Sequence, residues 1–173
     1  MRFPCHPVDA SFFDTAPMRF RNTIELAARP ADVFAIFEDG ESWPGWFHGI
    51  HKVVWTSDKP YGTVWLTGVT VQERFFRWEQ DRRLSFYLTG HSMPLAHALA
   101  EDYLLDEVAA GKTRFTYSVA IEPRLALSMA GPIARRLINS MLRDSCQGLQ
   151  SYVLKAGTSC RVGEDATKVG VQR

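Results

Sequence analysis

The sequence has few cysteines and no long run of apolar residues. Its three cysteines, Cys5, Cys146 and Cys160, are odd in number and widely scattered, which fits a reducing cytoplasm better than a disulfide framework. No stretch reaches the roughly 20 apolar residues that a membrane-spanning helix needs. The N-terminal MRFPCHPVDASFF also lacks an apolar core followed by a small-residue cleavage site. We therefore expect a cytoplasmic protein without a membrane span.

The chain also lacks an excess of charge of either sign. It has 20 Lys and Arg residues and 19 Asp and Glu residues, for a net charge of +1. Because we find no basic stripe, neither nucleic acid nor an anionic membrane is expected as a partner. A length of 173 residues with 46% hydrophobic and 23% charged residues is typical of one globular domain that buries a sizeable core.

Several catalytic signatures are absent as well. The sequence has no G-x-S-x-G elbow, no P-loop, no dinucleotide-binding glycine pattern and no C-x-x-C pair. Hydrolase, nucleotide-binding and redox functions therefore lose support, and no cofactor is expected. His48 and His51 form an H-x-x-H pair, but this spacing at a junction of helix and strand does not place both imidazoles on one surface. We expect no metal site.

Short strand-like runs dominate most of the chain. Residues 1–17 contain three prolines and no hydrophobic period, which indicates an extended N-terminal arm before a domain at 18–157. The domain begins with an alternating strand at 20–27, followed by two short helices in ADVFAIFED and SWPGWF. Further strands are expected at residues 50–56, 63–71, 73–80, 84–90, 97–108 and 112–122. The first strand is expected to pair with the last.

A long amphipathic helix closes the domain, from Gly131 to Gly157. Pro132 lies in its first turn, and Gly157 follows the last periodic residue. Halfway along the apolar face the large side chains give way to Ser145 and Gly148, where a solid core would continue with larger residues. We therefore expect space for an apolar small molecule between this helix and the sheet. Residues 158–173 are expected to form a disordered tail.

This order of elements predicts an α+β domain with a curved antiparallel sheet of six or seven strands around the C-terminal helix. Together with ELAARPADVFAIFED, W-P-x-W-F, EQDRRLSFYLTG, AEDYLLDEV and TRFTYSVAIEP, it resembles the START-like helix-grip superfamily over residues 18–156. The resemblance is to the SRPBCC proteins of the polyketide cyclase/dehydrase and lipid-transport type. It implies a deep cavity for lipids, polyketides or other hydrophobic ligands. The matching motifs are strand and turn signals, which say more about fold than about activity.

Aromatic residues are the main candidates for the cavity wall, since five Trp and eleven Phe are many for this length. Any one of them has a simpler interpretation as core. As inward pairs we take Phe76 with Trp78, Leu84 with Phe86, and Phe115 with Tyr117. The predicted ligand-binding residues are Trp46, Phe47, Trp65, Phe76, Trp78, Phe86, Phe115, Tyr117, Met141, Ser145 and Gly148.

The best candidate for acid–base chemistry is Glu101, which shares the parity of Leu99 and Tyr103 and so faces the concave side of the sheet. A carboxyl group in an apolar cavity has a raised pKa and serves as an acid or a base. Tyr103 and His91 are its candidate catalytic partners. The alternative is a structural ion pair of Glu101 with an arginine such as Arg74 or Arg114.

Two functions remain open from the sequence. The first is a carrier or sensor that encloses a hydrophobic or aromatic ligand and catalyses nothing. The second is a cyclase, aromatase or dehydratase acting on a polyketide-like substrate, in which Glu101, Tyr103 and His91 move protons. A cavity filled by side chains, in a domain that binds another protein, is a third possibility. The chain is expected to be a monomer or a homodimer.

Overall fold

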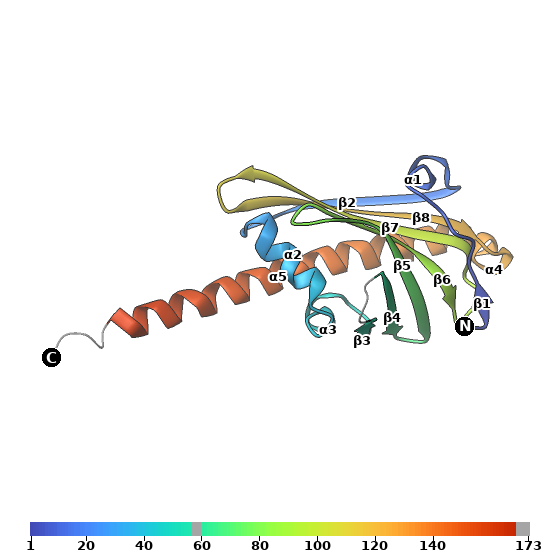
Figure 1. Cartoon of the computed structure of the whole chain (residues 1–173). Helices are drawn as coiled ribbons and strands as arrows, with labels where there is room; N and C mark the ends of the chain where they lie inside the picture. The colour runs from blue at the N-terminus through green and yellow to red at the C-terminus, as the bar shows by residue number, and fades with distance from the viewer. Residues whose placement is uncertain (57–59, 169–173) are drawn as a thin grey trace.

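The computed structural model of the chain describes residues 1–56 and 60–168. One curved antiparallel sheet forms the body, and the helices α2, α3 and α5 lie along one of its faces (Figure 1). The elements are, in chain order, β1 Phe3–Pro4, α1 Phe12–Thr15, β2 Met18–Leu26, α2 Pro30–Glu38, α3 Trp43–Trp46, β3 Ile50–Trp55, β4 Tyr61–Leu66, β5 Val69–Glu79, β6 Arg83–His91, β7 Ala96–Ala109, β8 Lys112–Pro123, α4 Leu125–Met129 and α5 Gly131–Lys168.

The strand order is β2-β8-β7-β6-β5-β4-β3, and β1 pairs with β6 outside this path. Strand β2 pairs antiparallel with β8, from Met18 opposite Ile121 to Leu26 opposite Thr113. The two short helices α2 and α3 lie between β2 and β3 in the chain. The predicted α+β architecture is therefore confirmed. The pairing of strand β2 with the last strand, β8, and the position of the two helices are confirmed as well.

Helix α5 packs against β2 and α3 and buries one face. Leu142, Cys146 and Leu149 on that face are fully buried, as the 3.6-residue period predicts. The helix continues past Gly157 to Lys168, so the predicted end at this glycine is wrong. One glycine weakens a helix without ending it, and the rest of the predicted tail, residues 169–173, lies outside the described residues. Within the described ranges, no helix combines the length and apolar character that crossing a membrane requires.

The N-terminal arm is held between two strands of the sheet. Strands β6 and β7 pair from Arg83 to Tyr87, and beyond this point the arm provides the hydrogen bonds. The backbone N–H of Cys5 donates to the carbonyl of Thr89, and that of His6 donates to the carbonyl of His97. The arm therefore satisfies backbone groups that the divergence of β6 and β7 would leave unpaired.

Two details of β4 and β5 differ from the sequence prediction. Residues 63–71 were expected as one strand, but Leu66 pairs with Val69 across a two-residue turn at Thr67 and Gly68. Gly68 has a φ of 81°, the left-handed conformation that glycine adopts without strain in such hairpin turns. Further along β5, the register shifts between Phe75 and Arg77, which ends strict alternation.

Candidate functional site

A cavity of about 150 Å³ lies between the concave face of the sheet and the helices α3 and α5. It is lined by Trp43, Phe47, Ile50, Val64, Leu66, Val69, Val71, Glu73, Leu88, Leu95, Leu99, Glu101, Tyr103 and Met141. This volume lies below the range of roughly 300 to 1,000 Å³ of drug-sized ligand sites. A cavity of about this size in another protein holds benzene. The space therefore fits a single ring or a short aliphatic segment.

Two carboxyl groups, Glu73 and Glu101, interrupt the apolar wall. Glu101 lies on β7, where Leu99 and Tyr103 share its side of the strand and also line the cavity. The neighbouring Asp102 points to the opposite face and is held there by Arg83 at 2.8 Å and Ser85 at 2.6 Å. Alternation along β7 thus places Glu101 on the concave side, as predicted.

Tyrosines are the hydrogen-bond donors to Glu101. The hydroxyl of Tyr117 donates to Oε2 of Glu101 at 2.6 Å, and that of Tyr103 donates to the same oxygen at 3.3 Å. The predicted ion pair with Arg74 or Arg114 is wrong. Arg74 donates instead to the hydroxyl of Tyr87, and Arg114 lies 3.9 Å from Glu25.

The second carboxyl group, on Glu73 of β5, was missed by the sequence analysis. Its residue is only 5% exposed, and its Oε2 has no hydrogen-bond partner among the described residues. Glu73 shares the inward side of β5 with Val71 and Phe75, which are also buried. The sequence carried one signal for this position: Val71 and Phe75 lie two residues before and after Glu73, and alternation in a strand puts all three on one face.

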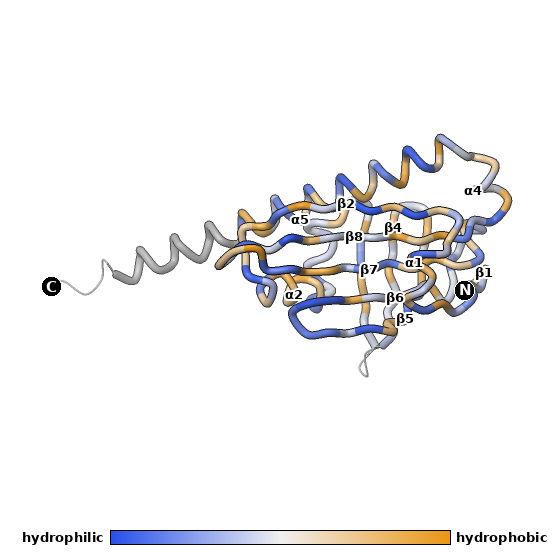
Figure 2. Tube along the Cα trace, turned by 90° about the horizontal axis from the view of Figure 1, so that it is seen from above, coloured by the Kyte–Doolittle hydropathy of each residue, from blue (hydrophilic) through white to orange (hydrophobic). Residues whose placement is uncertain are grey.

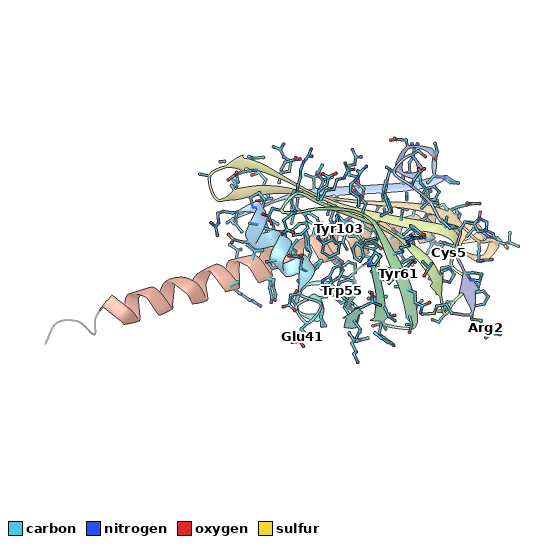
Figure 3. All side chains as sticks on the ribbon, in the orientation of Figure 1. Arg2, Cys5, Glu41, Trp55, Tyr61 and Tyr103 are labelled. Carbon is cyan, nitrogen blue, oxygen red and sulfur yellow. The ribbon has the colours of Figure 1, made fainter. Side chains whose placement is uncertain are left out.

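Packed rings fix the two tyrosines in place. Tyr103 and Tyr117 are each 1% exposed, and their ring centroids lie 4.8 Å apart at an interplanar angle of 84°. Tyr103 also packs against Phe37, Phe86 and Phe115, with centroids 5.1 to 5.6 Å away. Because the core holds both rings, their hydroxyl groups are set toward Glu101 without further ordering. Figure 3 shows Tyr103 among the side chains packed between the sheet and the helices.

Burial dominates the electrostatics of this group. It raises the pKa of Glu101 to about 7, against the smaller lowering effect of the hydrogen bonds from Tyr117 and Tyr103. Burial and the nearby charge of Glu101 raise the pKa of Glu73 well above its usual range. Burial also raises the pKa of both tyrosines. Near neutral pH, Glu101 therefore exchanges a proton, and Glu73 favours its protonated form more than an exposed glutamic acid does.

The structure places only some of the predicted ligand-binding residues on this cavity. Phe47 and Met141 line it, and Tyr117 reaches it through its hydrogen bond to Glu101. The other aromatic side chains that the prediction placed around the ligand, Trp46, Trp78, Phe86 and Phe115, pack within or against the core cluster. Leu84, the predicted partner of Phe86 on the inward face, is buried in the same cluster.

Two predicted cavity residues lie outside the concave face. Trp65 is 36% exposed, and the Lys52 ammonium group lies over its ring, 5.4 Å from the ring centroid. Phe76 contacts Tyr87 on the outer side, because Phe75 continues the inward alternation that precedes it, and the register shift after Phe75 then lets Trp78 pack against the core as well. Strand parity was therefore wrong at this position of β5, where the bulge interrupts alternation.

The space expected beneath Ser145 and Gly148 is already filled. A Cβ atom on Gly148 would lie 2.0 Å from the carbonyl oxygen of Trp46, so this glycine marks a close approach of α5 to α3. Ser145 is fully buried and donates to the carbonyl of Met141 in its own helix. The cavity lies elsewhere, and neither residue lines it.

His91 is not part of the carboxyl group. It is fully buried near the end of β6, its Nε2 lies 3.0 Å from the carbonyl oxygen of Ala96, and its ring stacks with Phe3 of the arm. It does not line the cavity with Glu101. In the described part of the chain, no three His, Cys, Asp or Glu side chains are grouped so that they could hold a metal ion. The chemistry available is therefore that of two carboxyls and two phenols.

The sequence matches the family described as "Polyketide cyclase / dehydrase and lipid transport" over residues 17–154. An uncharacterized protein of Mycobacterium tuberculosis is 35% identical over 162 residues, which span 87% of this chain and 93% of that protein. A protein of Mycobacterium bovis, also uncharacterized, matches to the same extent.

Solved structures show the same fold. A START superfamily protein from Mycobacterium smegmatis superimposes with a TM-score of 0.69 at 15% identity, over 80% of this chain and 98% of that one. The Zhui aromatase/cyclase from Streptomyces sp. R1128 superimposes with a TM-score of 0.62 at 16% identity, over 80% of this chain and 92% of that one. At these identities the likeness establishes the helix-grip, START-like fold alone.

Proposed function

Because this chain belongs to the polyketide cyclase/dehydrase and lipid transport family, we propose that it binds an apolar small molecule that carries a hydrogen-bond donor. The apolar part of this ligand occupies the cavity between the sheet and the helices α3 and α5. The donor, a hydroxyl or phenol, meets the carboxyl groups of Glu73 and Glu101. In this role the protein is a carrier or sensor.

The observation that carries this proposal is the unpartnered carboxyl oxygen of Glu73 beside Glu101, in a wall that is otherwise almost entirely apolar. A buried polar atom without a partner costs roughly 1 to 3 kcal/mol of stability. A pure hydrocarbon ligand would leave this cost in place and would exclude water as well. A ligand with a hydroxyl group gives the carboxyl oxygen a partner, so the site favours such ligands over hydrocarbons of the same shape.

The size of the cavity limits what enters without movement of the wall. About 150 Å³ accommodates one ring. Met141 on α5 is the most adaptable side chain of the wall, since methionine has three rotatable bonds and fills irregular spaces. A larger lipid or polyketide enters if Met141 and its neighbours on α5 move away from the sheet.

A second function, proton transfer in a cyclase or dehydratase, is favoured by the pKa of Glu101. A base works best when its pKa is near the working pH, and that of Glu101 is about 7. In this role Glu101 removes a proton from the carbon beside a ketone carbonyl, and the C–H electron pair forms an enolate. Protonated Glu73 donates a hydrogen bond to the enolate oxygen. A structural neighbour named as an aromatase/cyclase supports this alternative.

The carrier proposal is tested with phenol and toluene, which have nearly the same shape but differ in one hydroxyl group. Calorimetry should show that phenol binds about tenfold more tightly than toluene, since a hydrogen bond to a carboxyl group is worth about 1.5 kcal/mol or more. In Glu101→Met and Glu73→Met the preference should shrink while toluene binds at least as well. Equal binding of both probes to the unmodified protein would contradict the proposed role of the carboxyl groups.

Proton transfer is tested with acetophenone in D₂O. If Glu101 acts as a base, the protein should speed deuterium exchange at the methyl group, and Glu101→Gln should lower that rate by about 100-fold while affinity stays similar. Exchange no faster than in buffer would exclude proton transfer on this probe and leave the carrier function. Glu25→Gln, a carboxyl change on the outer part of β2, serves as the control.

A further inference from the structure

The helix α4 and the first turns of α5 carry an apolar stripe that no part of the described chain covers. Its four side chains are among the most exposed large apolar residues of the protein: Leu125 at 75%, Met129 at 78%, Ile133 at 70% and Leu137 at 66%. They follow one another at intervals of four residues, which places them along one side of each helix. Figures 1 and 2 show α4 and the start of α5 at one end of the molecule, away from the C-terminal end of α5.

Arginines flank this stripe, and acidic residues are absent from it. Between Arg124 and Arg143 the sequence contains no Asp or Glu. Arg136 lies next to Leu137 and three residues after Ile133, and Arg143 follows two turns later on the same side. The two arginines line a groove of about 470 Å³ between α5 and β2, together with Arg21, Asn22 and Asn139.

These arginines have no acidic partner among the described residues. Each ion pair found among the described residues involves other cations, which lie on β5, β6 and β8, in the turn before β6 and beside α2. Arg21 donates to the hydroxyl of Ser118, which is neutral. The groove therefore concentrates positive charge directly beside exposed apolar side chains. The sequence predicted no anionic partner because the net charge is only +1. That total includes acidic residues elsewhere in the chain and so does not reveal this local basic cluster.

We propose that α4 and the first half of α5 form a docking surface for a membrane rich in anionic phospholipids. Leu125, Met129, Ile133 and Leu137 enter the boundary between headgroups and acyl chains, and Arg136 and Arg143 pair with headgroup phosphates. A helix with a basic side next to an apolar side lies in the plane of such an interface. The arginine stems add to the apolar contact while their charged ends stay at headgroup level.

A second copy of the chain fits this surface less well. A symmetric dimer places the same patch on both sides of its interface, so the basic groups of one copy would meet those of the other. No acidic residue lies between Arg124 and Arg143 to offset the repulsion among the exposed side chains of the stripe. An anionic membrane instead complements both the apolar stripe and the arginines, because its acyl chains accept apolar side chains and its headgroups carry negative charge.

The docking surface and the cavity share helix α5. Met141 lines the cavity and lies one turn after Leu137. A docked protein therefore holds the cavity wall close to the lipid from which an apolar ligand would come. Docking itself does not depend on the proposed ligand, and it is measured without one.

The test is sedimentation of the full chain with vesicles of phosphatidylcholine alone or mixed equally with phosphatidylglycerol. The protein should bind the mixed vesicles, and added salt should weaken this binding. Ile133→Ser with Leu137→Ser should reduce the affinity about tenfold or more, and so should Arg136→Gln with Arg143→Gln. Val108→Ser with Leu154→Ser and Arg29→Gln with Arg82→Gln are the matched controls, and these should stay within about twofold of the parent.

Three results would overturn the proposal. The first is no binding to phosphatidylglycerol vesicles at low salt, which would leave an acidic protein as the partner of this surface. The second is unchanged binding by the folded double variants, as judged by circular dichroism. The third is a dimer in analytical ultracentrifugation that Ile133→Ser with Leu137→Ser dissociates, which would assign the surface to a second copy.

Discussion

The hydroxyl of Tyr117 donates a hydrogen bond of 2.6 Å to Oε2 of Glu101 across the neighbouring strands β8 and β7. Tyr117 lies opposite Tyr103 in this pair of strands, and Tyr103 is two residues from Glu101. Such a diagonal contact is within reach of a tyrosine side chain. This hydrogen bond lowers the pKa of Glu101, whereas burial raises it more strongly.

Tyr117→Phe should therefore raise the pKa of Glu101 above its value of about 7. The change removes the donor that favours the ionised carboxylate and leaves the apolar burial in place. The free energy of unfolding should fall by about 1 kcal/mol. Carbon-detected NMR of the Glu101 carboxyl measures the shift. Tyr87→Phe, whose hydroxyl accepts from Arg74, is the control. A lower pKa in Tyr117→Phe would contradict the assigned hydrogen bond.

Stability should fall as pH rises from about 4.5 to about 7, because the folded pKa of Glu101 is raised to about 7 from 4.5. Over this range the folded chain keeps a proton that the unfolded chain has lost. Below pH 4.5 both states are protonated and the stabilisation is complete, whereas above about 7 it is gone. The loss should be at most about 3 kcal/mol, since one pKa unit corresponds to 1.36 kcal/mol. Glu73, whose pKa is also raised, adds a loss of the same sign.

Urea unfolding at several pH values checks this dependence. Glu101→Gln should flatten the curve between about pH 4.5 and 7. Glu25→Gln should leave this window unchanged, because Lys112 lowers the pKa of Glu25 and its effect lies below 4.5. A stability that rises from pH 5 to 7 in the unmodified protein would be inconsistent with a half-buried Glu101 that has no cationic partner.

Glu73→Met should make the protein more stable, by about 1 to 3 kcal/mol near pH 7. Methionine removes a buried carboxyl oxygen without a partner and keeps a similar volume. The same change should weaken phenol binding, as is common when a binding site is stabilised at the expense of function. Thermal unfolding and calorimetry measure the two effects. A loss of more than about 1 kcal/mol would mean that Glu73 has a structural partner.

Gly148→Ala should destabilise the protein by about 2 kcal/mol or more. The added Cβ atom would lie 2.0 Å from the carbonyl oxygen of Trp46, which belongs to the backbone and moves only if α3 shifts. Gln147→Ala, the exposed neighbour on the same helix, controls for helix propensity. Chemical denaturation compares the two variants. Equal stability would place open space at Gly148, as the sequence analysis expected.

The sequence predicted the fold because the local signals agree with one another. Alternation places Glu101 and Tyr103 on the side of β7 that lines the cavity, and it places Asp102 on the opposite side. Phe115 and Tyr117 follow the same rule on β8. These residues could be predicted because β7 and β8 keep their register from Leu99 to Glu107, opposite Ile121 to Thr113.

The rest of the site depends on features with no local signal. The register shift after Phe75 interrupts the alternation of β5, so Phe76 and Trp78 do not share a face as their spacing of two predicts. A small residue such as Gly148 has two opposite meanings, either space or close contact with another backbone. Only the position of α3 separates these meanings, and that position depends on the whole fold.

The pKa of Glu101 tests the central claim most directly, because it reports whether a carboxyl group without a cationic partner lines the cavity. Titration of the Glu101 carboxyl carbon by NMR, with Glu101→Gln used to assign the signal, gives the value. A midpoint near 7 is expected, since burial outweighs the hydrogen bonds from Tyr117 and Tyr103. A midpoint below 4.5 would show that Glu101 is paired with a positive charge or exposed to water, and it would contradict both proposed functions of the cavity.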